Sequence, residues 1–241
     1  LGNYTVALPE FLKIEDNPEY KNIVPYYIIQ IYYAQKQFDK LNERADLLLK
    51  NNPTNKNNAE IYRIMGEISY SKNDYEKTIS YLKEYEKISP QVLRNDMYIL
   101  GLSYYQTKNF ANAAAYLSKA TTDNDEMTEN AYLHIGNAYI KLNDKNNARL
   151  AYEASLRSNF NKKVREEALY NYALPTYETT TAFGESITAF EQLLSEFPNS
   201  KYTDKAYDYL ASVYMTSKNY EAAYQSILKI KNPNSTLLEA R

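Results

Sequence analysis

The chain has 241 residues, 44% of them hydrophobic, and its 28 Lys and Arg residues nearly balance its 30 Asp and Glu residues, which leaves a formal charge of −2. This composition is typical of a globular protein with a sizeable core, and it argues against a protein that binds nucleic acid or an anionic membrane surface. Because the sequence contains no cysteine, it excludes disulfides, thiolate nucleophiles and the common structural zinc sites.

The N-terminal segments come first in chain order. Residues 1–18 are interpreted as the second helix of a repeat unit whose first helix is missing, with Tyr4, Ala7 and Phe11 at its packing positions. The longest apolar stretch, IVPYYIIQIYYA at 23–34, follows. It is shorter than the roughly 20 apolar residues that span a bilayer, so we expect no membrane insertion.

From residue 19 on, a helix–turn–helix pattern recurs. Each unit has a small position in its first helix and, nine residues later, an anchor residue that opens the second helix. The clearest small positions are Gly66, Gly101, Gly136 and Ala211. The anchors, 34 to 38 residues apart, are Tyr4, Phe38, Tyr75, Phe110, Lys145, Phe183 and Tyr220. Such a period is typical of helical solenoids. Glycine inside a helix costs about 1 kcal/mol relative to alanine, so we expect the small positions to let two helix backbones approach closely.

The period predicts one continuous solenoid. After the half-unit 1–18 we predict the start of a further unit at 235–241 and, between these ends, the repeats 19–54, 55–91, 92–126, 127–161, 162–199 and 200–234. The incomplete units at both ends predict that the sequence is a fragment of a longer array. In the repeat 162–199, Pro175 predicts the least regular of the first helices.

The unit resembles the tetratricopeptide repeat. The prolines that end the second helix in that family stand at Pro53, Pro90 and Pro198, while Lys145 departs from the usual aromatic anchor. The resemblance covers essentially the whole chain. It implies an all-α fold, a right-handed superhelix of about six helix pairs with a leading half-repeat, and a role as a protein-binding scaffold.

No residue pattern predicts an active site, a metal site or a cofactor. His134 is the only histidine, and no phosphate-binding loop or nucleophile motif is present. The carboxylate pairs Glu166 with Glu167 and Glu126 with Glu129 are interpreted as solvated charges, because general acid–base catalysis needs two carboxylates held across a cleft in different environments. We therefore expect a protein that is not an enzyme.

A second set of residues follows one face of the predicted first helices. In tetratricopeptide arrays this face lines the concave groove, and here we expect it to be aromatic, nearly uncharged and suited to an extended peptide or a partner helix. The alternative is that the tyrosines fill the groove by packing on one another. A clamp for a C-terminal carboxylate is not predicted, because Asn137 alone does not make one. The candidate groove residues are Tyr26, Tyr33, Arg63, Tyr70, Tyr98, Tyr105, Asn137, Tyr170 and Tyr177.

The segment SEFPNSKYTDKAYDYLASVY at 195–214 resembles a pattern found in bacterial envelope repeat proteins, including outer-membrane assembly lipoproteins. The resemblance favours a periplasmic or envelope location, with the cytoplasm as the alternative. The leading hypothesis is a non-enzymatic interaction scaffold with a protein or peptide partner. The alternatives are a repeat platform of a larger enzyme or regulatory protein whose active domain lies outside this sequence, and a structural self-assembly module.

Overall fold

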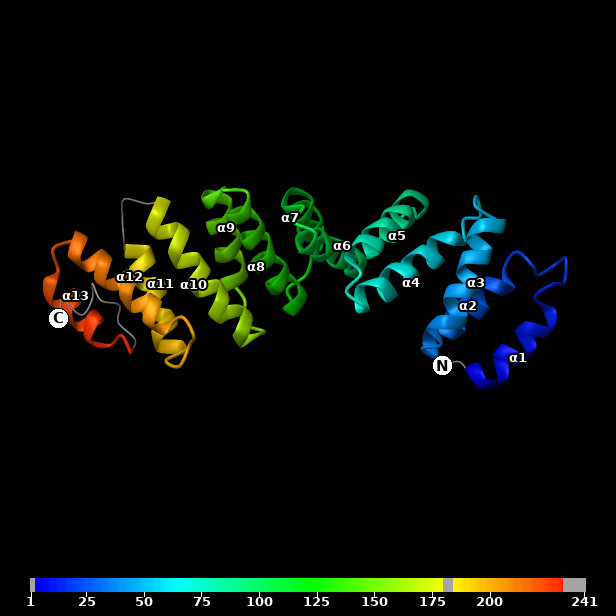
Figure 1. The fold of residues 1–241 in the computed structure, drawn as a ribbon, viewed down its shortest axis with the longest axis horizontal. Coiled ribbons are helices and arrows are strands. Elements are labelled where there is room, and N and C mark those ends of the chain that lie inside the picture. Colours follow the sequence, from blue (N-terminus) through cyan, green and yellow to red (C-terminus); the bar gives the residue numbers. More distant parts are fainter. Residues whose placement is uncertain (1–2, 180–183, 232–241) are drawn as a thin grey trace. The chain divides into compact units, whose positions relative to one another are not determined.

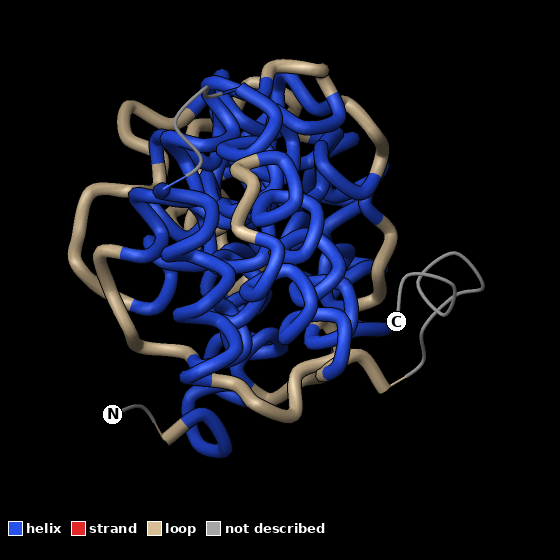
Figure 2. The backbone as a smooth tube through the Cα atoms, turned by 90° about the vertical axis from the view of Figure 1, so that its left-hand side faces the viewer, coloured by secondary structure: helices blue, strands red, loops and turns tan. Residues whose placement is uncertain are grey.

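The computed structural model describes residues 3–179 and 184–231. Within these residues the secondary structure is helical, with connecting loops and no strand (Figures 1 and 2), so the fold is an all-α helical repeat, as predicted. The chain divides into two compact units, unit 1 (Leu1–Lys108) and unit 2 (Asn109–Arg241).

In the described part of unit 1 the helices are α1 (Tyr4–Ile14), α2 (Val24–Ala34), α3 (Phe38–Asn51), α4 (Asn58–Ser71), α5 (Tyr75–Ile88) and α6 (Arg94–Gln106). Consecutive helices pack on one another, and α4 also contacts α2 and α6. The first helices of successive repeats, α2, α4 and α6, therefore form one face of unit 1.

In the described part of unit 2 the helices are α7 (Phe110–Lys119), α8 (Glu126–Lys141), α9 (Lys145–Leu156), α10 (Lys162–Thr179), α11 (Gly184–Glu196), α12 (Thr203–Thr216) and α13 (Tyr220–Leu228). The pairs α8 with α9, α10 with α11 and α12 with α13 pack together, and α10 also contacts α8 and α9.

The unit boundary lies inside the predicted repeat 92–126, between its helices α6 and α7. The helix α8 begins at Glu126, one residue before the predicted start of the next repeat. The predicted opening turn at 235–241 lies outside the described residues.

The anchors mark the starts of helices. Six of the seven are the first residues of helices, as predicted, and Phe183 lies outside the described residues; the six are Tyr4, Phe38, Tyr75, Phe110, Lys145 and Tyr220.

Each described turn before an anchor contains one residue in the left-handed region, with φ between 57° and 63°. At the turn into α5, the residue after Asn73 is Asp74, whose N–H donates to the Ser69 carbonyl at 2.9 Å and whose side chain accepts the N–H of Lys77. These bonds satisfy orphan groups at the end of one helix and the start of the next. The left-handed residues are Lys36, Asn73, Lys108, Asn143 and Lys218.

Two small positions allow the close approach that the sequence predicts. A Cβ atom added to Gly66 would lie 2.6 Å from Cδ2 of Leu82 on the paired helix, and one added to Gly136 would overlap the ring of Tyr152. Leu82 and Tyr152 are each 1% exposed, so they have no free space to retreat into. The glycines therefore exchange local helix stability for burial of a large side chain against the helix backbone.

The helix predicted to be least regular, α10, continues through Pro175 to Thr179. A proline removes one backbone donor from the helix. Next to it, the hydroxyl of Thr176 donates to the Tyr172 carbonyl at 2.7 Å.

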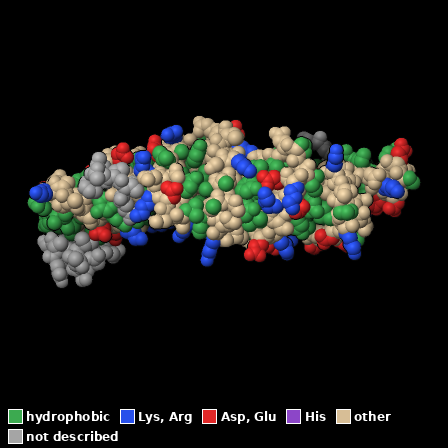
Figure 3. All heavy atoms as spheres, turned by 90° about the horizontal axis from the view of Figure 1, so that it is seen from above, with side chains coloured by type: hydrophobic (Ala, Val, Ile, Leu, Met, Phe, Trp, Pro, Cys, Tyr) green, Lys and Arg blue, Asp and Glu red, His purple; other side chains and the backbone are tan. Residues whose placement is uncertain are grey.

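The apolar stretch at 23–34 forms the short helix α2, in which Ile28 and Ile29 are 0% and 1% exposed. In the part of the chain that the structure describes, no helix combines the length and hydrophobicity of a membrane span. On the face shown in Figure 3, acidic and basic side chains are interspersed with hydrophobic ones.

Candidate functional site

The candidate groove residues all lie on first helices. In unit 1, Tyr26 and Tyr33 belong to α2, and the other candidates of this unit belong to α4 and α6: Arg63, Tyr70, Tyr98 and Tyr105. In unit 2, Asn137 belongs to α8, and Tyr170 and Tyr177 belong to α10.

Tyr26 was predicted to line the groove, but it is buried. It is 6% exposed and belongs to the hydrophobic core of unit 1. Its hydroxyl donates to Oδ1 of Asn58 at 3.1 Å, and the Asn58 amide donates to the Asn52 carbonyl at 2.7 Å. Tyr26 therefore fixes α2 against the start of α4 and does not line an open surface.

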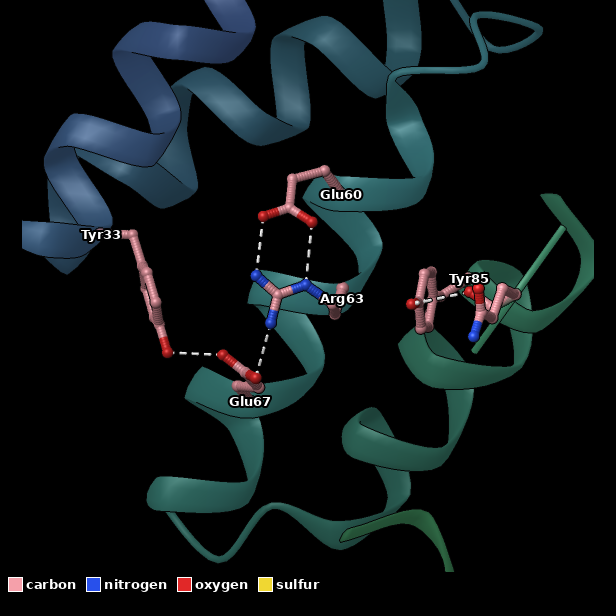
Figure 4. A network of polar contacts seen from close by, with 6 residues as sticks. Tyr33, Glu60, Arg63, Glu67 and Tyr85 are labelled. Carbon is pink, nitrogen blue, oxygen red and sulfur yellow. Dashed lines mark hydrogen bonds and ion pairs between the residues drawn. The ribbon is translucent and has the colours of Figure 1, made fainter. Parts of the chain in front are cut away.

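Tyr33 and Arg63 belong to a polar network that joins α2 to α4 (Figure 4). The Nε and Nη2 atoms of Arg63 donate to the two oxygens of Glu60 at 2.8 and 2.7 Å, and its Nη1 donates to Glu67 at 2.7 Å. The Tyr33 hydroxyl donates to the other oxygen of Glu67 at 2.5 Å. Burial, together with the hydrogen bond to Glu67, raises the pKa of Tyr33 to about 12.

This network results from helical spacing. Glu60, Arg63 and Glu67 are three and four residues apart on α4, so their side chains lie on one side of the helix. The hydrogen bond to Glu60, the strongest influence, raises the pKa of Arg63, which stays positively charged. Both ends of the network are therefore held in place before any ligand is bound.

A third carboxyl group faces the network from α6. Asp96 is 1% exposed, and neither of its side-chain oxygens has a hydrogen-bond partner. Burial raises the pKa of Asp96 to about 7; Arg63 opposes the rise, and the negative charges of Glu67 and Glu60 add to it. Beside this face, unit 1 therefore holds one guanidinium bonded to two carboxylates, with the carboxyl group of Asp96 buried next to them.

Asp96 is not among the candidates predicted from the sequence, although the repeat pattern marks it. Asp96 lies five residues before the small position Gly101, and the corresponding residues of other repeats are Ile61, Ala131 and Ala206. Those three are core residues with exposures of 1%, 0% and 0%. Asp96 therefore places a carboxyl group at a position that is apolar in these repeats.

The remaining candidates of unit 1 are half-buried. The ring of Tyr70 packs edge-on against Tyr75, with 6.0 Å between the centroids, and burial raises the pKa of Tyr70. Tyr98 and Tyr105 on α6 are also half-buried. We define the first-helix face of unit 1 as the exposed parts of Tyr33, Arg63, Tyr70, Tyr98 and Tyr105.

In unit 2, Asn137 is engaged with its own neighbours. Its Oδ1 accepts the Tyr152 hydroxyl at 2.8 Å and the Asn171 amide at 3.0 Å, and its own amide donates to Glu167 at 3.4 Å. These bonds link α8 to α9 and α10.

The tyrosines of α10 also pack on side chains of unit 2. Tyr170 is 8% exposed and stacks on Tyr202 with 4.1 Å between the ring centroids, and burial raises the pKa of Tyr170 to about 12. Tyr177 meets Tyr209 edge-on at 6.0 Å and is half-buried. For Tyr170, the alternative in which the tyrosines pack on one another holds, and the groove prediction is wrong.

The prediction that Glu129 is a solvated charge is wrong. It is 1% exposed, and its Oε2 accepts the backbone N–H groups of Phe160 at 3.2 Å and Asn161 at 2.8 Å, just before α10. Glu126 accepts the Asn161 side-chain amide at 2.7 Å. Both carboxylates therefore order the connection into α10.

His134 contacts a backbone carbonyl of its own helix: Nδ1 lies 3.0 Å from the Asn130 oxygen. Among the described residues, no group of His, Asp and Glu side chains is arranged to hold a metal ion.

Comparisons with known proteins identify the repeat. A family profile described as tetratricopeptide repeat matches residues 97–122 and 129–162. A search of curated proteins finds no match.

Solved structures show the same fold. YrrB, described as a TPR protein with an unusual peptide-binding site, is 14% identical, with 78% of this chain and 93% of that chain covered and a TM-score of 0.62. The C-terminal part of a TPR protein from Cytophaga hutchinsonii is 18% identical over 98% of this chain and 94% of that chain, with a TM-score of 0.60. MamA is 22% identical over 67% of this chain and 90% of that chain, with a TM-score of 0.56. The matched profile identifies residues 97–122 and 129–162 as tetratricopeptide repeats, and the helix pairs of the described residues have the fold of the solved TPR proteins.

Proposed function

We propose that this chain is a protein-interaction scaffold that binds an extended segment of a partner protein on the first-helix face of unit 1. The single observation that carries the proposal is the set of half-buried tyrosines on the neighbouring helices α2, α4 and α6, around a preformed polar network. The family supports the general role, since tetratricopeptide repeats commonly bind proteins or peptides.

The chemistry of these residues suits a peptide. A tyrosine ring offers a large apolar contact area at a small entropic cost, and its hydroxyl bonds to peptide amides. Tyr33 is already held by Glu67 and Arg63 by Glu60, so binding does not have to order them. Tyr26 and Tyr170 are left out of the proposed site because both are buried; in unit 2, Asn137 and Tyr177 are the half-buried candidates.

The test is affinity capture with the double variant Tyr98→Ala/Tyr105→Ala. We expect this variant to lose the captured partner while circular dichroism shows the helix content of the wild type. The matched control is Tyr220→Ala/Tyr224→Ala, which removes two tyrosines that are 60% and 42% exposed on the second helix α13. Equal capture by both double variants would overturn the proposed site.

The predicted location in a bacterial periplasm or envelope stays a prediction. Fractionation of the source cells, followed by detection of the chain in each fraction, checks it. Partner capture from the same fractions also separates an interaction scaffold from a self-assembly module, because only the latter would recover further copies of this chain alone.

A further inference from the structure

Asp96 is poorly explained by the stability of the fold. A buried carboxyl group without a hydrogen-bond partner costs free energy, whether it is charged or protonated, because it has lost its hydration. The repeats around Ile61, Ala131 and Ala206 avoid this cost by placing an apolar side chain at the same position. An apolar residue in place of Asp96 would therefore remove this free-energy cost.

The cation of the network does not hydrogen-bond to Asp96. Arg63 is the one cation among the three α4 groups of the network, and its hydrogen bonds go to Glu60 and Glu67. Glu67 accepts the Tyr33 hydroxyl and is itself only an acceptor, so it can hydrogen-bond to Asp96 only while Asp96 carries a proton. The cluster thus holds three acidic groups and one basic group, and a further cation would reduce this excess of acidic groups.

The network also contains a contact that an incoming cation can replace. Arg63 is held by Glu60 through two parallel hydrogen bonds and by Glu67 through a single one. A second cation can therefore take over the Arg63 contact to Glu67 while Arg63 stays on Glu60. The side chains of Arg63 and Glu67 are 17% and 15% exposed, so this edge of the cluster reaches the surface.

We infer that Asp96 and Glu67 form a receptor for one basic side chain, arginine or lysine, of the partner segment. The inference rests on the proposed function and specifies the chemistry of the partner. Charge complementarity selects the occupant, since a cation pairs with ionised Asp96 and reduces the excess of acidic groups. The half-buried rings of Tyr70, Tyr98 and Tyr105 on the same helices suit the aliphatic stem and the charge of such a residue.

The experiment is selection of phage-displayed random dodecapeptides on the immobilised chain, in its wild-type form and as Asp96→Ala. We expect wild-type selections to fix arginine or lysine at one peptide position and Asp96→Ala selections to lose that preference. A selected peptide should bind about tenfold more weakly when its basic residue is replaced by citrulline or glutamine, as expected for loss of a charge-assisted hydrogen bond. The matched control is Asp39→Ala, which removes an exposed acid from the second helix α3.

The outcomes separate the inference from the proposed function. Peptides that are enriched without a basic residue, and that lose binding in Tyr98→Ala/Tyr105→Ala, would overturn the receptor while supporting the peptide-binding face. Absence of any enrichment over a blank surface would overturn both. Because Asp96→Ala introduces the residue found at Ala131 and Ala206, we expect its melting temperature to equal or exceed that of the wild type; a large decrease would indicate a structural role for Asp96 and contradict the receptor.

Discussion

At the scale of single residues, the molecule departs from the repeat pattern where a polar group occupies a packed position. Asp96 replaces an apolar core residue, and Glu129 is a buried carboxylate that accepts two backbone N–H groups. The two differ in their hydrogen bonding, since Glu129 is partnered through Oε2 and Asp96 has no partner at either oxygen. The difference has consequences for stability that titration and substitution can measure.

Asp96 should make stability fall as pH rises. Its pKa is raised from 3.8 to about 7 in the folded chain. Between these values the folded chain holds a proton that the unfolded chain has released, so each unit of rising pH lowers the free energy of unfolding by up to about 1.4 kcal/mol. The loss is complete above the folded pKa. Urea denaturation of wild type and Asp96→Asn at pH 5, 6, 7 and 8 measures this slope as the difference between the two proteins, and parallel curves would contradict it.

Gly66 and Gly136 should not tolerate a methyl group. Gly66→Ala places a Cβ against Leu82, and Gly136→Ala places one against Tyr152, so each should lower the free energy of unfolding by about 1–3 kcal/mol through overpacking. Gly184→Ala is the matched control, since nothing lies within 4 Å of a Cβ at that residue. Thermal melting of the three variants checks the order, and equal melting temperatures would show that the helices separate without cost.

At the scale of elements, the repeated turn determines where one helix ends and the next begins. A left-handed residue is followed by a capping residue in the turns before α5, α7, α9 and α13, where Asp74, Asn109, Asp144 and Asn219 accept the N–H of the third residue of the helix. Lysine at the left-handed position is sterically costly, because its Cβ crowds the backbone there. Replacing a left-handed lysine by glycine should therefore raise the free energy of unfolding.

Lys218→Gly should raise the free energy of unfolding by about 0.5–1 kcal/mol, because glycine adopts the observed φ of 61° without strain. Lys205→Gly, at an exposed position in the first turn of α12, should lower it by up to about 1 kcal/mol, because glycine is a poor helix former. Denaturation of both variants gives the comparison. A loss of stability in Lys218→Gly would show that the lysine side chain contributes more than its backbone strain costs.

At the scale of the whole molecule, the chain consists of two compact units, and the boundary between them separates two helices of one predicted repeat. Unit 2 has hydrophobic clusters of its own, centred on Leu169, Phe190 and Leu193 and on Leu133 and Tyr152. Unit 1 has a cluster centred on Ile28, Ile61 and Ile64. Since these cores do not share residues, each unit has its own source of stability.

A fragment of residues 109–241 should therefore be helical and unfold cooperatively. Its clusters lie entirely within the fragment, so the burial that stabilises its helix pairs is retained. Circular dichroism and thermal melting of the fragment test this expectation. A non-cooperative melt would mean that unit 2 depends on unit 1 for its fold.

Local chemistry was sufficient to predict the helices, the anchors and the close packing at Gly66 and Gly136, because period, small residues and capping residues act within one repeat. Only the tertiary structure decided which of the candidate groove residues are exposed. Tyr26 and Tyr170 share the helical register of Tyr33 and Tyr177, yet Tyr26 is buried with a hydrogen bond to Asn58 of α4, and Tyr170 is buried against Tyr202, which precedes α12. The charge of the site was decided in the same way, since Asp96 meets Glu67 only through packing of α6 on α4. Exposure and pKa depend on neighbours that are distant in sequence, and a helical period carries no information about them.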